Sequence, residues 1–340
     1  MSDMVQLTLE QVHELSMNAL SAQGFSPEQA RAIADTVTAA ERDDCKSHGL
    51  FRIPFYVGAL KIPDVNAAAV PVVSDLAPGV VQVDACLGFA PLALQMGADP
   101  LTEKARENGI ACLCITNAYN VAALWPEVER LAQRGLVAFA FTAALPYVAP
   151  AGGRRPLYGT NPMAFAWPRK GRPPMVFDQA SSVTARGEIQ LHLRDGKPIP
   201  EGWAIGPDGK PTTDPKVALQ GAQLTFGGHK GAAIALMVEL LAGALVGDLF
   251  SFEAAGYDKG VGAPRGGEFM IAIDPNRCVR SGAEDQLDHA ERLFEKILEQ
   301  EGTRLPSDRR FEARKRTPRD GVKIPKSLYE TIIEFTGGSK

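Results

Sequence analysis

The chain has few cysteines and no long apolar run. Its five cysteines in 340 residues are an odd number, and none lies in a Cys-x-x-Cys pair, so the sequence indicates neither a disulfide framework nor a zinc knuckle or other metal site. The most apolar helix-like stretch, 231–246, is shorter than the roughly 20 residues that span a bilayer and contains Glu239. The first residues lack the basic and apolar regions of a signal peptide. We therefore expect a cytoplasmic protein with no membrane partner.

The chain also lacks an excess of positive charge and a Gly-x-Gly-x-x-Gly motif. Its formal net charge is −4, so no global field attracts nucleic acid. Without that glycine motif a standard Rossmann dinucleotide fold is disfavoured. The hydrophobic fraction of 45% and charged fraction of 22% are globular values, and the length predicts two domains at about 150 residues each.

Two capped helices open the sequence. Thr8 and Gln11 form a capping-box pattern before a helix that ends at Gly24. Ser26 and Gln29 form a second capping-box pattern, with proline at the first helical position, before a helix over 27–43. The middle of the chain alternates strands and helices and is predicted to be α/β. We expect strands at 80–83, 110–115, 136–141 and 269–273, and helices at 91–107, 122–133 and, long and buried, 230–246. Residues 150–225 have the composition of loops that build a site.

The two ends of the chain are similar in texture. A charged helix over 284–300 and a final helix over 326–334 resemble the N-terminal helices. Because chain termini often lie close in space, we expect 1–72 and 286–340 to form one helical domain. The α/β domain, 73–285, would then be inserted between them.

His48 and Arg52 form the first candidate for chemistry. Residues four apart lie on one side of a helix or a strand, so His48 as an acid and Arg52 as a bidentate carboxylate ligand can face one pocket. A surface Ser-His-Gly turn with a solvated arginine explains the same pattern.

A glycine-rich turn precedes the apolar helix at 230–246. Its sequence, Phe226-Gly-Gly-His-Lys-Gly, combines glycines, Lys230 and a helix N-terminus, which suits a phosphate group. A tight loop that lets a helix approach a sheet explains it equally well.

Polar residues at the ends of apolar runs are a third candidate, as ligand contacts or as turn formers. They lie in Tyr158-Gly-Thr-Asn-Pro, Val176-Phe-Asp-Gln-Ala and Ala185-Arg-Gly-Glu. The basic run from Arg309 to Arg316 is interpreted as a solvated helix face or as intersubunit salt bridges, with a ribose phosphate as the alternative partner. Cys112 and Cys114 share one face of a strand and are predicted to be core residues.

Five motifs in a fixed order carry a resemblance to a known family. They are Ser47-His-Gly-Leu-Phe-Arg-Ile-Pro, Ala122-Ala-Leu-Trp-Pro, Tyr158-Gly-Thr-Asn-Pro, Gly227-Gly-His-Lys-Gly and Arg304-Leu-Pro-Ser-Asp-Arg-Arg. Together, over nearly the whole chain, they resemble the malate/L-lactate dehydrogenase family with its non-Rossmann nicotinamide-binding fold. Within it the chain is most similar to the Δ1-piperideine-2-carboxylate/Δ1-pyrroline-2-carboxylate reductases, which reduce cyclic imino acids with NADPH to L-pipecolate and L-proline.

The resemblance implies a role for each motif. His48 would donate the proton with Ser47 and Glu188 as its relay partners, and a carboxylate beside His48 would raise its pKa. Arg52 and Thr160 would hold the substrate carboxylate. NADPH, with NADH as the alternative, would lie along Tyr119, Asn120, Val121, Ala122, Ala123, Asp178, Gln179, Ala180, Arg186, Gly187, His229, Lys230, Arg304, Leu305, Pro306, Ser307, Asp308, Arg309 and Arg310. A homodimer is also implied.

Two positions depart from the family pattern. Relatives usually carry a histidine where this chain has the segment of Tyr119 and Asn120, so an imidazole contact is replaced by a neutral amide. At position 188, hydroxy-acid dehydrogenases of the family often have lysine, whereas Glu188 keeps the negative charge of the imine reductases. This favours imines over keto acids. A malate-like or lactate-like 2-hydroxy acid dehydrogenase is the alternative enzyme, and a non-catalytic nucleotide-binding relative is the third hypothesis.

Overall fold

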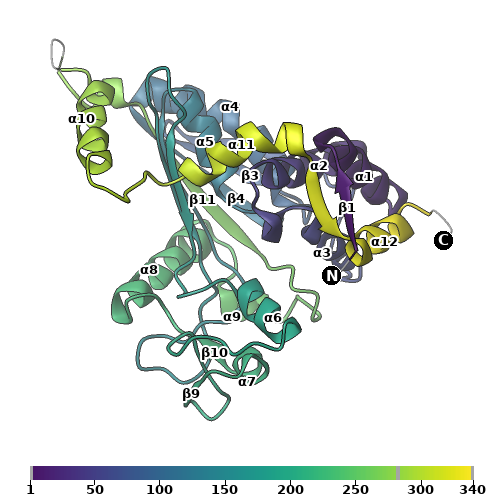
Figure 1. The fold of residues 1–340 in the computed structure, drawn as a ribbon. Coiled ribbons are helices and arrows are strands. Elements are labelled where there is room, and N and C mark those ends of the chain that lie inside the picture. The colour runs from purple at the N-terminus through teal and green to yellow at the C-terminus, as the bar shows by residue number, and fades with distance from the viewer. Residues whose placement is uncertain (1–2, 281–283, 338–340) are drawn as a thin grey trace.

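A seven-stranded sheet forms the centre of the molecule (Figure 1). The computed structural model describes residues 3–280 and 284–337. In spatial order the strands are β2 (Val72–Ala77), β3 (Val80–Asp84), β4 (Ile110–Tyr119), β11 (Arg265–Ile273), β5 (Val137–Thr142), β6 (Met163–Trp167) and β7 (Met175–Gln179). Of the neighbouring pairs described, β3 and β4 run parallel and the others antiparallel. The fold is mixed α/β, as the sequence predicts.

Alternating side chains bury both faces of this sheet. Leu113 and Ile115 of β4 face α4 (Ala90–Asn108) and α5 (Trp125–Gln133), while Cys114 faces the side of α8 (His229–Glu239). The prediction that both cysteines are core residues is confirmed for Cys114, whereas Cys112 is half-buried and packs at the edge of the same cluster. The five cysteines are all free thiols.

The helix expected to be long and buried at 230–246 differs from that prediction. It consists of α8 and a π-helical turn over Leu240–Leu245. Leu236, Leu240 and Leu245 are 45%, 50% and 60% exposed, because only one side of the helix covers the sheet. The apolar composition of a helix does not by itself distinguish a fully buried helix from one that exposes apolar side chains on one side.

The two chain ends pack side by side (Figure 1). Strand β1 (Met4–Leu7) pairs with β12 (Val322–Pro325), and α1 (Leu9–Ala22) lies against α12 (Lys326–Phe335). With α2 (Pro27–Arg42) and α3 (Ile53–Ala59) they enclose a separate apolar cluster. Thr8 and Gln11 form the expected capping box. Ser26 caps α2, but the Gln29 side chain bonds to Ala69 O and to the N–H of Phe89 instead of closing a second box.

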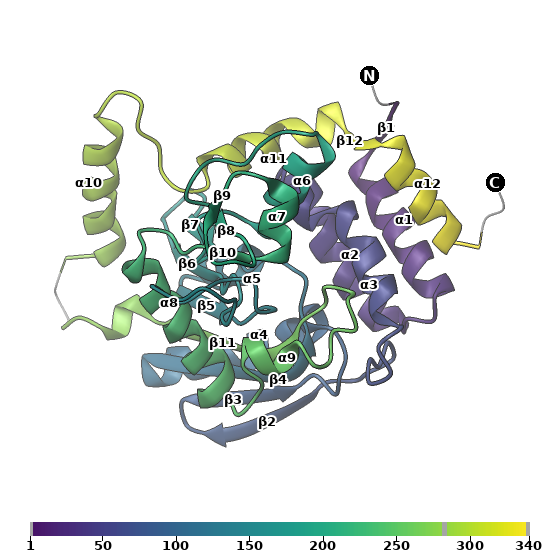
Figure 2. The ribbon, with the colours of Figure 1, turned by 90° about the horizontal axis from the view of Figure 1, so that it is seen from below.

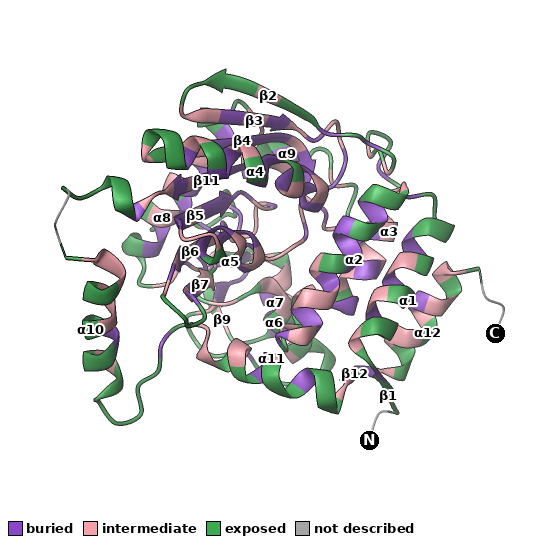
Figure 3. Cartoon of the chain, turned by 90° about the horizontal axis from the view of Figure 1, so that it is seen from above, coloured by how far each residue is buried: buried purple, intermediate pink, exposed green. Residues whose placement is uncertain are grey.

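Helix α10 (Gln286–Leu298) does not join this bundle. It projects from the opposite side of the sheet and is mostly exposed (Figure 3). Arg169, in the β6–β7 connection, holds it through Glu291 at 2.6 Å. The expectation that all of 286–340 packs with the N-terminal helices is wrong for this segment, because charge pairing draws it to the β6–β7 turn. Residues 1–2, 281–283 and 338–340, which the expected domains include, lie outside the described residues.

Residues 150–225 are more regular than expected. Strands β6 and β7 extend the main sheet, and a small lobe lies below it in Figure 1 and in front of it in Figure 2, which is seen from below. The lobe contains α6 (Arg186–Arg194), α7 (Pro215–Gln220), β8 (Ala204–Ile205), β9 (Pro211–Thr212) and β10 (Ala222–Gln223). Helix α9 (Ser251–Ala254) lies between α8 and β11 along the chain, and α11 (Asp308–Asp320) precedes β12. No helix in the described part of the chain is long and apolar enough to cross a membrane.

Candidate active site

The segment after α2 carries the candidate acid and carboxylate ligand. Two short 3₁₀ turns, Lys46–His48 and Leu50–Arg52, meet at Gly49. A Cβ at Gly49 would overlap the Glu41 carboxylate, whose Oε1 accepts a hydrogen bond from the N–H of Leu50 at 2.8 Å. A side chain at position 49 would therefore have to displace the buried Glu41 carboxylate from this bond. Burial raises the pKa of Glu41 to about 7, and the Leu50 bond partly opposes this.

His48 and Arg52 are held close together, as their spacing predicts. Ser47 Oγ lies 3.1 Å from His48 Nδ1, and Arg52 Nε donates to Ser47 O at 2.7 Å. The Arg52 guanidinium also stacks 5.1 Å from the centroid of the Phe55 ring. Burial, and secondarily the charge of Arg52, lowers the pKa of His48 to about 3. His48 is therefore neutral in the free chain, and the expectation of a raised pKa is wrong for this state.

Glu188 does not contact His48 in this structure. It lies in the first turn of α6, and its Oε1 is 3.8 Å from Nε2 of His192, one turn along the same helix. The Glu188 side chain is half exposed, so helix geometry brings it to His192 and not to the 3₁₀ turns. The expected raising of the His48 pKa therefore has no carboxylate to cause it here.

Tyr147 is a site residue that sequence reasoning missed. The Arg186 guanidinium stands 3.8 Å from the centroid of its ring, and Arg52 lies near enough to act on its pKa. Burial raises the pKa of Tyr147, while the charges of Arg186 and Arg52 oppose this. A single tyrosine in a loop has no spacing pattern that would have identified it. Arg186 of the small lobe therefore stacks on Tyr147, and Arg52 of the helical end acts on the same phenol through its charge.

Thr160 lies on a turn fixed by its neighbour. Its carbonyl oxygen accepts from Ser181 N at 2.7 Å. Asn161 adopts a left-handed φ of 38°, and its Nδ2 donates to Glu239 Oε1 at 2.8 Å on α8. The Tyr158-Gly-Thr-Asn-Pro motif is therefore anchored to the helix through buried amide and carboxylate groups, which fixes where Thr160 stands.

The loop over residues 120–124 is held by side-chain bonds. Asn120 Oδ1 accepts from Ala122 N at 2.8 Å, and Asp178 Oδ2 accepts from the N–H groups of Leu124 and Trp125 at 2.9 and 3.0 Å. Helix α5 therefore begins at Trp125, not at Ala122 as expected, and Asp178 caps it. Burial raises the pKa of Asp178, and those two hydrogen bonds oppose the shift.

The other residues expected along this loop and β7 differ in exposure. Tyr119 is fully buried and packs on Phe89, so its side chain offers no surface to a cofactor, and Val121 is buried as well. Ala122, Ala123, Ala180 and Gly187 are half-buried, and Gln179 is exposed.

The segment 304–310 wraps against β7. Arg310 Nη2 donates to Val176 O at 3.1 Å and to Ser307 Oγ at 2.8 Å, and its guanidinium lies 5.2 Å from the Trp125 ring centroid. The Nε of Arg310 is buried without a partner. Leu305 is buried, and its N–H is capped by Asp308, whereas Arg304, Pro306 and Arg309 are exposed.

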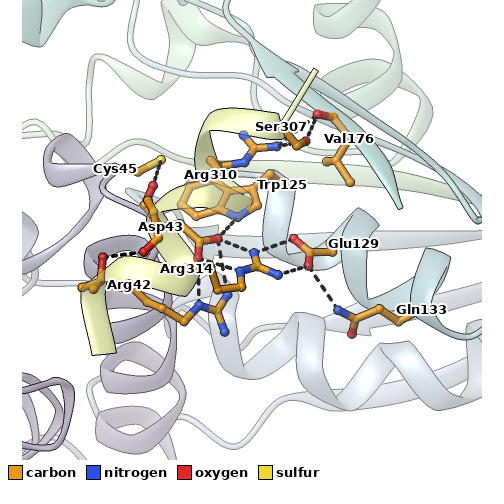
Figure 4. Close-up of polar contacts among 12 residues, drawn as sticks. Arg42, Asp43, Cys45, Trp125, Glu129, Gln133, Val176, Ser307, Arg310 and Arg314 are labelled. Carbon is orange, nitrogen blue, oxygen red and sulfur yellow. Dashed lines mark hydrogen bonds and ion pairs between the residues drawn. The ribbon is translucent and has the colours of Figure 1, made fainter. Parts of the chain in front are cut away.

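Arg314 joins three helices beneath this segment (Figure 4). Its guanidinium bonds to Asp43 after α2 and to Glu129 of α5. Asp43, whose side chain is fully buried, also accepts from Trp125 Nε1 at 3.2 Å. Burial raises the pKa of Asp43, but the bonds from Arg314 and Arg42 outweigh it and hold the pKa below its usual range. The basic run from Arg309 to Arg316 is therefore not a purely solvated helix face, because the Arg314 guanidinium hydrogen-bonds to carboxylates of the same chain.

A cavity of about 480 Å³ opens beside the start of α8. Gly227 and Gly228, with φ of 56° and 61°, line it together with Thr225 and His229. Consecutive left-handed glycines before a helix N-terminus, with Lys230 in the first turn, form a donor set that suits a phosphate. With the unpartnered Nε of Arg310, these residues fit a phosphorylated nucleotide.

Comparison with known proteins gives a consistent result. The family model described as malate/L-lactate dehydrogenase matches residues 7–333. The chain is 53% identical to a Δ1-pyrroline-2-carboxylate/Δ1-piperideine-2-carboxylate reductase of Pseudomonas aeruginosa, covering 97% of this chain and 99% of that protein. It is 51% identical to a Δ1-pyrroline-2-carboxylate reductase of Pseudomonas fluorescens, covering 98% and 99%.

A solved structure matches equally well. The Δ1-piperideine-2-carboxylate reductase of Pseudomonas syringae pv. tomato superposes with a TM-score of 0.92 at 40% identity, covering 97% of this chain and 99% of that one. The family match spans both the helical ends and the central sheet, and it includes every segment of the candidate site. This chain belongs to the malate/L-lactate dehydrogenase family.

Proposed function

We propose that this chain reduces the cyclic imino acids Δ1-pyrroline-2-carboxylate and Δ1-piperideine-2-carboxylate to L-proline and L-pipecolate, with NADPH as reductant and NADH as the alternative. The names of its relatives at 53% and 51% identity support this reaction. The observation that carries it is the pairing of His48 and Arg52 through Ser47 at the edge of the helical domain.

The substrate site is proposed between two domains, the helical one that the two chain ends form without α10 and the central α/β one of residues 73–285. Arg52 would bind the substrate carboxylate through its planar guanidinium, with Thr160 as a second ligand. His48 would donate the proton to the ring nitrogen, with Ser47 and Glu188 as relay partners. Because Glu188 contacts His192 here, its part in the relay requires the carboxylate to leave His192 and approach His48.

The neutral His48 of the free chain is compatible with this role. Arg52 lowers the pKa of His48, and a substrate carboxylate bound to Arg52 would offset that charge. The bound carboxylate is also an anion near the imidazole, so both effects raise the pKa when substrate binds. We expect a His48 ring-proton titration by NMR to move to higher pH when a flat ring carboxylate is added.

The cofactor is proposed to lie along the 120–124 loop, β7, the start of α8 and the 304–310 segment. When bound, NADPH supplies the hydride that reduces the imine carbon. The α8 N-terminus and Lys230 would hold a phosphate, and the exposed Arg304 and Arg309 would contact the ribose phosphate that distinguishes NADPH from NADH.

A homodimer and a cytoplasmic location complete the proposal. The open apolar face of Leu236, Leu240 and Leu245 supports self-association, because exposed apolar patches of this kind mark interfaces. Light scattering of the purified protein would test the dimer.

Substrate preference tests the reaction directly. NADPH oxidation is followed with the two cyclic imines, with pyruvate and with oxaloacetate, at matched enzyme concentration. The proposal predicts that the imines are preferred by kcat/KM. Preference for a keto acid would establish the malate-like or lactate-like alternative, and NADPH binding without turnover on any of the four would establish a non-catalytic relative.

A further inference from the structure

Glu268 is a buried acid that the proposed reaction does not use. It lies on β11, opposite Thr142 of β5 and Ile115 of β4, and is 1% exposed. The register of β11 against β4 shifts between Gly266 and Glu268. Such a bulge redirects a side chain and is common beside active sites. Position 268 is thus set apart from the regular alternation of the sheet.

The Glu268 carboxyl holds the 120–124 loop through one side chain. Its Oε2 accepts from Asn120 Nδ2 at 2.9 Å, and Asn120 Oδ1 in turn accepts from Ala122 N at 2.8 Å. The Asn120 N–H donates to Pro264 O at 3.1 Å, which fixes the start of the loop. Both ends of the Asn120 amide are therefore occupied, and Glu268 determines which way it points.

Among the described residues, the charged groups that act on Glu268 are acids. Glu127 of α5 and Asp178 of β7 lie near enough for their charges to raise its pKa, and in the described chain neither lysine nor arginine bonds to it. Its second oxygen, Oε1, is buried without a partner. Burial, and then the charge of Glu127, raises the pKa of Glu268 to about 8, while the Asn120 bond partly opposes the shift. Glu268 is therefore mainly protonated at neutral pH.

We propose that Glu268 is a positioning residue that sets the 120–124 loop through Asn120 and that releases a proton when the oxidised cofactor, and not the reduced one, occupies that loop. The inference rests on the proposed function, which places the cofactor along this loop, and it takes the nicotinamide end to be the end beside Asn120. The nicotinamide ring is cationic when oxidised and uncharged when reduced. A cation over the loop favours the carboxylate form of Glu268, whereas the uncharged ring leaves the buried acid neutral.

Titration calorimetry in buffers of different ionisation enthalpy measures this proton. If the cation lowers the pKa of Glu268 from about 8 to about 7, binding of NADP⁺ near pH 7.5 releases about half a proton per site, and NADP⁺ binds up to tenfold more tightly at high pH than at low pH. NADPH binding releases none beyond the contribution of its phosphate groups, which both cofactors share. His48, neutral in the free chain, has no proton to release.

Two isosteric variants assign the proton. In Glu268→Gln the difference between NADP⁺ and NADPH disappears, while NADPH still binds. In the matched control Glu127→Gln the difference remains and its midpoint moves to lower pH, because a like charge that raises the pKa of Glu268 is gone. A third variant, Asn120→Ala, frees the loop and raises KM for NADPH. Because Glu268 acts on the loop through Asn120, adding Glu268→Leu to this variant does not raise KM for NADPH further.

The outcomes separate this inference from the proposed function. Equal proton release with NADP⁺ and NADPH in the wild-type chain overturns the inference even if Glu268→Gln does not fold. A difference that survives in Glu268→Gln also overturns it. If neither cofactor binds, the proposed function fails first.

Discussion

Replacing Arg314 by methionine removes the cation that joins α2, α5 and α11. The Arg314 side chain is 22% exposed, whereas its partners Asp43 and Glu129 are 0% and 6% exposed. In Arg314→Met, Asp43 keeps its bond from Arg42 at 2.8 Å, but Glu129 retains only a bond from Gln133. Removing one partner of a buried ion pair costs about 3–5 kcal/mol. Because Asp43 stays paired, we expect the lower end, about 3 kcal/mol.

Urea unfolding monitored by tryptophan fluorescence measures this loss, since Trp125 bonds to Asp43. The matched control is Lys315→Met, on the next position of α11, where Lys315 pairs with Glu312 at 2.7 Å and is exposed. An exposed pair of this kind contributes about 0.3–0.5 kcal/mol. The reasoning is refuted if Arg314→Met loses less than about 1 kcal/mol or no more than Lys315→Met.

The pH dependence gives an independent check on the same network. The pKa of Asp43 is held below its usual range in the folded chain. A carboxyl with a lowered folded-state pKa stabilises the fold above its unfolded pKa, and this stabilisation is lost as the pH falls through the folded value. The difference in stability between wild type and Arg314→Met should therefore be full at pH 7 and shrink below about pH 4.

Three further changes test the site. Arg52→Lys should raise KM for the imino acid strongly and leave the affinity for NADPH unchanged, because a point charge cannot replace a planar bidentate contact. Weaker NADPH binding with normal substrate kinetics would show that Arg52 does not belong to the substrate site. Glu188→Gln should leave the pKa of His48 in the free chain unchanged, because Glu188 contacts His192 there. It should lower the alkaline limb of the pH–rate profile, because the carboxylate is proposed to approach His48 in the complex; an unshifted limb would exclude Glu188 as relay partner. Gly49→Ala should destabilise the fold by about 1–3 kcal/mol in thermal unfolding, because its Cβ overlaps Glu41; unchanged stability would show that the turn has room.

Local patterns in the sequence predicted the elements that local physics decides. The Thr8 and Gln11 capping box, the strand alternation that buries Cys114, and the closeness of His48 and Arg52 depend on spacing within a few residues. The α/β class follows from the same periodicities.

Long-range charge pairing could not be read in the same way. Helix α10 leaves the terminal bundle because Arg169 pairs with Glu291, 122 positions away. Asp178 sets the start of α5 from 53 positions away, so the helix begins later than its sequence pattern suggests.

The candidate site shows the same division. The motif that contains Thr160 marks a turn that hydrogen bonds hold in place, and the motif that contains His229 marks a turn that lines a cavity. Tyr147 and Glu268 have no motif and are identified only by what surrounds them: two arginines near one, two acids and an unpartnered oxygen beside the other.

The most direct test of the account is the kinetics of His48→Ala with a cyclic imine and NADPH. A positioned general acid contributes about 10²- to 10⁴-fold to the rate, so kcat should fall by that factor while the dissociation constant of NADPH stays the same. Single-turnover measurement of NADPH oxidation separates this chemical step from product release. Full activity in His48→Ala would contradict the central claim that His48 donates the proton to the imine.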